Sequence, residues 1–177
     1  MIKEIFLNTL KIFWLFLPAM FANRGALMSK KLLPGFNFPI DFNKTFRGKR
    51  VLGSHKTWRG LIVGVLFSTL VFIVQKYILK LIPSFQDFGL IDYGSTSFVF
   101  GGLLGFGSLF GDSVKSFFKR QRNTKPGEAW LPFDQIDWIL GTVLFALPFL
   151  VIDLKLILSM LLFTILYSVF TFYFYPR

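Results

Sequence analysis

Three aspartates in the second half of the chain have the residue type and spacing of a metal-binding set. Asp134 and Asp137 stand three residues apart in "LPFDQIDWILG", so in a helix they share one face. Two like charges on one face repel unless a cation lies between them, and Mg²⁺ commonly takes one or two carboxylates together with substrate phosphates. The alternative is that the dipole of a helix beginning there stabilises both carboxylates. Asp112, at the end of a glycine-rich apolar run, is the third candidate ligand.

Basic side chains accompany Asp112 along the stretch "GDSVKSFFKR". Asp112, Lys115, Ser116 and Lys119 follow the i, i+3, i+4, i+7 spacing of one helix face, and Arg120 comes next. Cations gathered in this way can bind phosphate groups. The alternative is an exposed helix end whose cations follow from membrane topology, which accounts for the cations but not for the acid.

A second basic motif, "LGSHKTWRG", precedes another apolar segment. Ser54 or Thr57 can cap the helix that begins there, and Lys56 and Arg59 bracket its start. Free backbone N–H groups, a helix dipole and two cations together form an anion site. A capped helix with ordinary positive charges is the alternative. The glycine and lysine spacing of a P-loop is absent.

The rarity of histidine and cysteine narrows the chemistry. The single histidine, His55, excludes a multi-histidine metal site within one chain, and the absence of cysteine excludes disulfides, thiolate metal sites and a cysteine nucleophile. Three acids and many cations are instead the residue types that phosphoryl or nucleotidyl transfer requires. In such reactions catalysis consists mostly of positioning and charge neutralisation.

The composition is that of a membrane protein with a single domain, residues 1–177. Hydrophobic residues make up 54% of the chain and charged residues 16%, whereas a soluble domain is about 25% charged. The net charge of +11 would suggest nucleic acid in a soluble protein, but basic loops and anionic lipid headgroups are the ordinary explanation in a membrane protein. We therefore expect the lipid bilayer as a partner, a lipid as one substrate and no nucleic acid.

Five segments approach the roughly 20 apolar residues that a helix needs to cross a bilayer. They are 5–22, 60–82, 93–110, 136–152 and 156–175. The sequence thus predicts an all-α integral membrane protein with about five transmembrane helices and two polar loops, the last two helices forming a hairpin through a link at 153–155. Gly101 and Gly105 of the third segment form a small-xxx-small pair for close helix packing. The alternative is that these glycines clear space for a lipid chain or a nucleotide.

The distribution of Lys and Arg predicts the orientation in the cell membrane. The loop at 23–59 carries nine such residues, the loop at 111–135 carries five including Lys125, and Arg177 follows the last segment. The positive-inside rule places both loops and the C-terminus in the cytoplasm and the N-terminus outside. Asp112, Asp134 and Asp137 then lie at the cytoplasmic ends of neighbouring spans, where they can meet.

Three motifs together carry a family resemblance. "PIDFNKTFRGKRVLGSHKTWRG", "GDSVKSFFKR" and "DQID" occur in this order, and with them residues 17–141 resemble the CDP-archaeol synthases. These are membrane cytidylyltransferases related to the CDP-diacylglycerol synthases. The resemblance implies a Mg²⁺-dependent reaction in which an unsaturated archaetidic acid, a glycerol phosphate with two ether-linked isoprenoid chains, attacks the α-phosphorus of CTP. The products are the CDP-lipid and diphosphate.

The resemblance also implies roles for individual residues. The expected catalytic residues are Asp112, Asp134, Asp137 and Lys119, with the three aspartates as metal and nucleotide-phosphate ligands. Asp41, Lys44 and Arg47 match the preceding loop of the family. The expected substrate contacts are Asn23, Ser54, Lys56, Thr57, Arg59, Lys115, Ser116 and Arg120.

Two departures and three alternatives accompany this reading. The stretch before "DQID" lacks the Lys-Asp pair and His-Gly-Gly of the diacyl enzymes, which favours the archaeol branch, and Phe42-Asn43 stands where glycine is expected.

A phosphatidate cytidylyltransferase is the nearest alternative. A CTP-dependent lipid kinase would also use CTP. A small membrane transporter or anion-binding protein is the non-enzymatic alternative, but a transporter should carry polar groups near mid-membrane.

Overall fold

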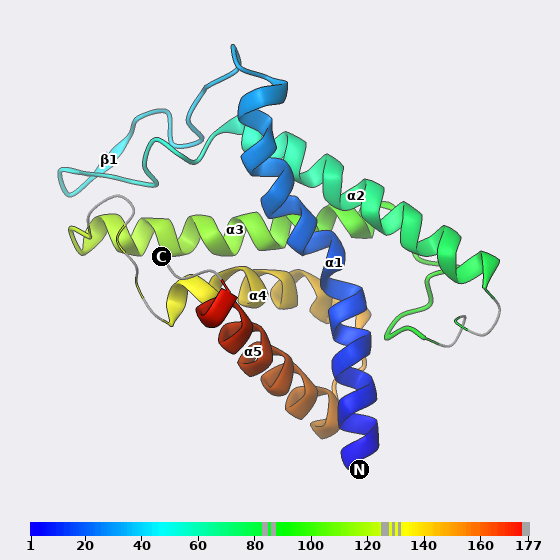
Figure 1. The fold of residues 1–177 in the computed structure, drawn as a ribbon. Coiled ribbons are helices and arrows are strands. Elements are labelled where there is room, and N and C mark those ends of the chain that lie inside the picture. Colours follow the sequence, from blue (N-terminus) through cyan, green and yellow to red (C-terminus); the bar gives the residue numbers. More distant parts are fainter. Residues whose placement is uncertain (83–84, 86–87, 125–127, 129, 131, 175–177) are drawn as a thin grey trace.

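Five α-helices and one small β-hairpin make up the computed structural model, which describes residues 1–82, 85, 88–124, 128, 130 and 132–174 (Figure 1). This architecture confirms the predicted all-helical class. Lys125 and Arg177, used in predicting the orientation, lie outside the described residues, as does the last residue of the fifth expected span. In chain order the elements are α1 (Ile2–Leu32), β1 (Thr45–Phe46), β2 (Lys49–Arg50), α2 (Trp58–Leu81), α3 (Val99–Gln121), α4 (Phe133–Ala146), a 3₁₀ turn η2 (Leu147–Phe149) and α5 (Leu154–Phe174).

Three of the described helices, α1, α2 and α5, are long and apolar enough to cross a membrane. Helix α4 has 14 residues, about 21 Å at 1.5 Å per residue, and is shorter than a complete crossing of about 30 Å. The expected fourth span to residue 152 is therefore too long: Pro148 follows α4 in a 3₁₀ turn and cannot continue the helix. The link to α5 is correspondingly longer than the predicted 153–155.

Helix α3 begins later and ends later than the apolar run that predicted it. Asp92 accepts backbone hydrogen bonds from Gly94 (2.8 Å) and Ser95 (3.4 Å), which form a turn before the helix. The helix then continues without a break through Asp112 to Gln121, as the spacing of its polar residues predicted. One rigid element therefore carries both the glycine-rich segment and the charged face.

Glycines bring α3 and α4 into close contact. A Cβ atom at Gly111 would collide with the carbonyl oxygen of Asp137, and one at Gly141 would collide with the carbonyl oxygen of Gly107. Backbone therefore packs directly on backbone here. Because Gly111 precedes Asp112, this contact places Asp112 beside Asp137.

The expected glycine pair packs against α2. A Cβ atom at Gly105 would overlap the side chain of Ser68, one at Gly101 would overlap Phe72, and the Ser68 hydroxyl donates a 2.6 Å hydrogen bond to the carbonyl oxygen of Gly101. Close helix packing is thus confirmed. The alternative that these two glycines clear space for a ligand is wrong, because α2 side chains fill that space.

An aromatic cluster in the core ties α1 to α4 and α5. Phe16 of α1 is fully buried and meets Trp138 of α4 and Phe163 of α5 edge-on, at centroid distances of 6.3 and 5.6 Å. Helix α5 packs mainly on α1 and makes fewer contacts with α4. The position of α5 is therefore set chiefly by α1.

The basic loop between α1 and α2 folds around one buried carboxylate. Asp41 accepts hydrogen bonds from Arg50 Nη2 (2.8 Å) and from the backbone nitrogens of Leu52 (3.0 Å) and Gly53 (3.2 Å). Burial alone would raise the pKa of this carboxyl, but the hydrogen bonds, that of Arg50 first, outweigh it and hold the pKa below its usual range. Asp41 thus fixes the end of the β-hairpin and the chain that leads to α2.

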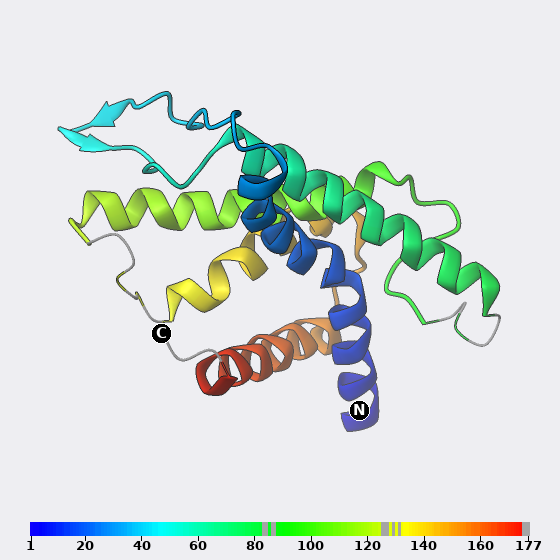
Figure 2. The same ribbon diagram turned by 45° about the horizontal axis from the view of Figure 1, so that its top comes forward.

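The hairpin rests on the C-terminal end of α3 (Figures 1 and 2). Lys49 Nζ donates a 2.6 Å hydrogen bond to the carbonyl oxygen of Gln121, and the rings of Phe46 and Phe117 lie 5.9 Å apart. Phe42 and Asn43 hold left-handed backbone angles, with φ of 48° and 62°, which explains why glycine is expected there. The first basic loop therefore lies at the end of α3 from which the second loop departs.

We expect Gly141→Ala to lower the free energy of unfolding of the detergent-purified protein by about 1–3 kcal/mol, and with it the unfolding temperature, because the added methyl group forces α3 and α4 apart. Thermal unfolding followed by circular dichroism measures the effect. Gly35→Ala is the matched control, since nothing lies within 4 Å of the added Cβ there. Equal unfolding temperatures for the two variants would contradict the close α3–α4 contact.

Asp41→Asn should lower stability at neutral pH by about 1–3 kcal/mol, because buried donors lose a charged acceptor. Since folding lowers the pKa of Asp41, its stabilisation is complete above about pH 3.9, the ordinary aspartate value. It is lost as the pH falls through the lower folded pKa. The variant should therefore lose less stability than wild type on acidification, in unfolding curves measured at several pH values. Ser54→Ala, in the same loop, should follow wild type, and parallel curves for Asp41→Asn would contradict this role.

Candidate active site

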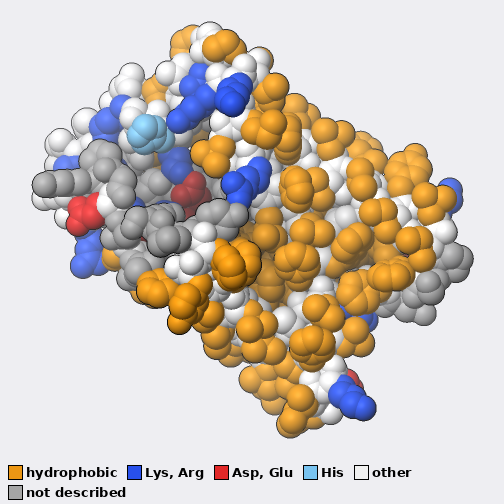
Figure 3. All heavy atoms as spheres, in the orientation of Figure 1, with side chains coloured by type: hydrophobic (Ala, Val, Ile, Leu, Met, Phe, Trp, Pro, Cys, Tyr) orange, Lys and Arg blue, Asp and Glu red, His pale blue; other side chains and the backbone are white. Residues whose placement is uncertain are grey.

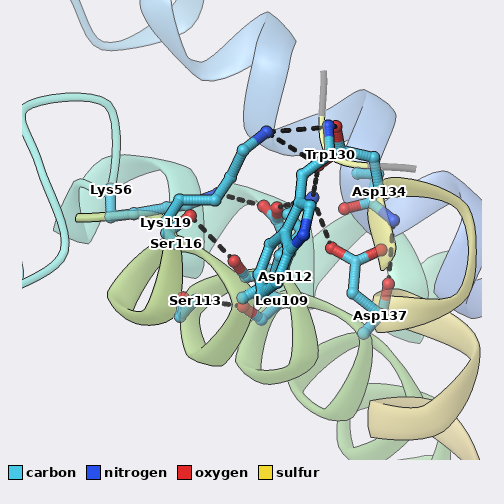
Figure 4. A network of polar contacts seen from close by, with 12 residues as sticks. Lys56, Leu109, Asp112, Ser113, Ser116, Lys119, Trp130, Asp134 and Asp137 are labelled. Carbon is cyan, nitrogen blue, oxygen red and sulfur yellow. Dashed lines mark hydrogen bonds and ion pairs between the residues drawn. The ribbon is translucent and has the colours of Figure 1, made fainter. Parts of the chain in front are cut away.

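The three predicted aspartates, Asp112, Asp134 and Asp137, lie together in one network of polar contacts (Figure 4). Lys115 Nζ lies 3.1 Å from Asp112 Oδ1, 3.1 Å from Asp134 Oδ1 and 2.6 Å from Asp137 Oδ2. Asp112 and Lys115 come from α3, and the other two acids come from the first turns of α4. The glycine contact between these helices therefore produces the cluster.

Two further lysines complete the neutralisation of these acids. Lys56, just before α2, pairs with Asp112 Oδ2. Lys119 Nζ lies 3.0 Å from both oxygens of Asp134 and donates a 2.6 Å hydrogen bond to the carbonyl oxygen of Glu128. The side chain of Asp134 is only 1% exposed, and such a buried carboxylate requires paired charges or hydrogen bonds. The cluster therefore balances three carboxylates with three ammonium groups.

The donor chemistry of the cluster suits a hard divalent cation. Within the residues that the structure describes, no three Asp, Glu, His or Cys side chains form a ready metal-binding group, because lysines separate the three aspartates. One oxygen of each aspartate nevertheless lies within 3.1 Å of the same positive charge, the ammonium of Lys115. Carboxylate oxygens are the ligands that Mg²⁺ takes. Asp112, Asp134 and Asp137 would therefore be the residues to hold such an ion.

A cavity of about 1180 Å³, here called the polar cavity, opens beside this cluster. Figure 3 shows acidic side chains within a hollow flanked by Lys and Arg side chains, next to an extensive apolar surface. Helix α5 forms one wall, and its described residues that line the cavity are uncharged. The polar residues that line it include Asn23, Arg24 and Lys30 of α1, His55, Lys56 and Thr57 before α2, Asp112 and Lys115 of α3, Asp134, Gln135 and Asp137 of α4, and Tyr167 and Thr171 of α5.

The expected substrate residues divide into two groups. Asn23, Lys56, Thr57 and Lys115 line the polar cavity. Asn23 also donates a 2.8 Å hydrogen bond to Ser108 Oγ, and Thr57 caps α2 by accepting from the Gly60 nitrogen at 3.3 Å. Both side chains are therefore held in place from within the fold.

Four other expected contacts lie away from the cavity in the described part of the chain. Arg59 Nη1 donates to the carbonyl oxygens of Leu33 and Pro34 at 3.2 and 3.0 Å, where the end of α1 leaves acceptors unsatisfied. Ser116 Oγ bonds back to the carbonyl oxygen of Asp112 at 2.8 Å. Arg120 and Ser54 do not line the cavity either, and Ser54 is exposed in its loop. A role of these four residues in substrate binding stays a prediction.

The structure adds cavity residues that the sequence reasoning missed. Leu27 and Lys30 line the cavity from the same face of α1 as the expected Asn23, and their i+4 and i+7 spacing from Asn23 was the available signal. The basic members of this helix were interpreted only as topology signals. Tyr167 and Thr171 of α5 lie in an uncharged apolar segment and carried no signal.

The fold and the site define a class: a helical intramembrane protein with a charged cavity suited to phosphate groups and a divalent cation. The sequence model described as CarS-like, CDP-archaeol synthase, matches residues 2–174. The chain therefore belongs to the CDP-archaeol synthase family.

Curated relatives and a solved structure agree with this membership. CDP-archaeol synthase of Thermococcus kodakarensis is 42% identical over 139 residues, covering 77% of this chain and 72% of that protein. The Pyrococcus furiosus protein of the same name is 38% identical over 140 residues, covering 78% and 75%. A solved structure described as an intramembrane enzyme for archaeal membrane lipids biosynthesis superimposes with a TM-score of 0.66 at 23% identity, covering 92% of this chain and 94% of that one. The fold is therefore shared with that enzyme.

We expect Lys115→Met to lower the free energy of unfolding by about 3 kcal/mol or more, because it leaves buried carboxylates facing one another. Added divalent cation should restore more of the unfolding temperature in this variant than in wild type. Differential scanning fluorimetry with and without Mg²⁺ or Mn²⁺ measures both effects. Lys155→Met is the control, since its partner Glu4 is 53% exposed and such a pair contributes little. An unfolding temperature insensitive to the loss of Lys115 would contradict its role in the cluster.

Proposed function

We propose that the chain transfers the cytidylyl group of CTP to an unsaturated archaetidic acid, a phosphorylated isoprenoid ether lipid, giving the CDP-lipid and diphosphate. Family membership supports this activity. The observation that carries it is the convergence of three aspartates and several cations on one cavity beside an apolar surface. A charged site at a membrane surface suits a reaction between a nucleotide and a lipid phosphate.

In this reaction a phosphate oxygen of the lipid forms a bond to the α-phosphorus of CTP. The bond between the α-phosphorus and the oxygen that bridges it to the β-phosphorus breaks, and diphosphate leaves. The anionic lipid phosphate is already a nucleophile, so the chain needs chiefly to position the two anions and neutralise their charge. Lys56 and Lys115 line the cavity and supply positive charge there, and Lys119 orients Asp134. A divalent cation, which we take to be Mg²⁺, would be held by the three aspartates and would neutralise the triphosphate.

We further propose that both basic loops and the C-terminus face the cytoplasm and that the N-terminus lies outside the cell membrane. The hydrogen bond from Lys49 to Gln121 supports this orientation, because it joins the first basic loop to the end of α3 where the second begins. Loops rich in Lys and Arg are retained on the cytoplasmic side.

We expect purified protein with CTP, Mg²⁺ and the ether-lipid acceptor to place label from the α-phosphate of CTP in the lipid. Label from the γ-phosphate should remain in water-soluble diphosphate. Lipid extraction and scintillation counting measure both. Transfer of the γ-label would identify a lipid kinase, equal turnover of ester-linked phosphatidate would favour the diacyl alternative, and no transfer to either acceptor would reject the proposed activity.

Asp134→Asn and Asp137→Asn should each lower turnover about tenfold or more, because each removes a charge from the cluster that is needed in the transition state. The same radiolabel assay measures the loss. Glu4→Gln, at the N-terminal end of α1, is the matched control and should retain wild-type turnover. Near-normal rates for both aspartate variants would reject their role as ligands.

A further inference from the structure

A second cavity, of about 430 Å³, adjoins the polar cavity and is here called the apolar groove. Among the described residues that line it, every side chain except Ser113 is apolar. Ile40, Leu61, Leu109 and Ser113 line both cavities, so the two spaces share a wall. The volume falls within the range of about 300–1,000 Å³ that is usual for ligand pockets.

The groove runs along one face of α3. Phe106, Phe110, Ser113, Val114 and Phe117 line it, at the i, i+4, i+7, i+8, i+11 spacing of a helix face. Asp112, Lys115 and Lys119 of the cluster lie on another face of the same helix. A ligand held in the groove is therefore placed in fixed register with the charged site.

Polar interactions within the basic loop hold the other wall of the groove. Leu52 and Ile40 come from the basic loop. The Leu52 nitrogen bonds to buried Asp41 at 3.0 Å, and the Ile40 nitrogen bonds to the carbonyl oxygen of Lys56 at 2.9 Å. This wall is thus a built part of the fold, whereas an ordinary lipid-facing surface would have no such cover.

The lining of the groove is partly open to its surroundings. Phe110 and Val114 are 42% and 38% exposed, although they lie under the loop wall and beside a charged cavity. An acceptor lipid must bring its phosphate to the polar cavity while its hydrocarbon chains avoid water. A hydrocarbon chain in the groove satisfies both requirements, because the groove joins the polar cavity through four common residues.

We propose that the apolar groove binds one hydrocarbon chain of the acceptor lipid and thereby positions the lipid phosphate, an inference that rests on the proposed function. The hydrocarbon chain of the lipid leaves a bilayer that is as apolar as the groove. Binding in the groove therefore positions the lipid more than it increases its affinity. Its occupant is a long hydrocarbon chain, and Val114 and Leu52 set the space available to it.

Val114→Trp tests the groove by filling it. We expect it to lower kcat/KM about tenfold for an acceptor with long isoprenoid chains, and to change kcat/KM for a short-chain, water-soluble acceptor and the KM for CTP by less than about twofold. Leu66→Trp is the matched control, because Leu66 is 56% exposed on α2 and lines neither cavity. Unchanged long-chain turnover, or equal loss with both acceptors, would overturn the proposal.

Photo-crosslinking of the wild-type protein tests the groove without any substitution. An acceptor carrying a diazirine within one chain should give adducts on residues 106–117 or on Leu52, mapped by mass spectrometry. Adducts confined to the α5 wall, at Tyr167 or Phe170, would overturn the groove assignment. A wild-type protein that makes no CDP-lipid from either acceptor would instead count against the proposed function, so the two failures are distinguishable.

Discussion

Neutralisation of three clustered carboxylates is the constraint on which the rest of the structure depends. Asp112, Asp134 and Asp137 lie within reach of one ammonium group, and without such pairing their mutual repulsion would separate the helices that carry them. The pairing in turn requires α3 and α4 to approach at backbone distance, which Gly111 and Gly141 allow. The same two helices, α3 and α4, therefore provide both the close packing and the charge pairing of the site.

The same balance bears on how the site receives its substrates. Lys115 is engaged by all three acids, and a triphosphate brings negative charge of its own. Under the proposed function, a metal ion would take over the acids and leave ammonium groups for phosphates. Under the proposed function, the lysines that pair with the acids would thus also serve the substrate phosphates.

Periodicity and charge in the sequence predicted much of this arrangement. The spacing of Asp112, Lys115 and Lys119 predicted that α3 continues beyond Gly111, and Thr57 was one of two predicted caps of α2. The pairing of Lys115 with all three acids could not be predicted, because it depends on the crossing of α3 and α4. The bonds of Arg59 to the end of α1 could not be predicted, because a cation near a cavity and a cation bonded to a helix end have the same sequence signature. The α5 wall carried no polar signal, so only its packing identifies it.

The wall that α5 forms and the aspartates of the site belong to different helices. Helix α5 forms a wall of the polar cavity, packs mainly on α1 and contributes none of the three aspartates. The acids and Lys115 belong instead to α3 and α4, which the glycine contact holds rigidly together. The shape of the polar cavity on its α5 side and the carboxylates that line it are therefore determined by different helices.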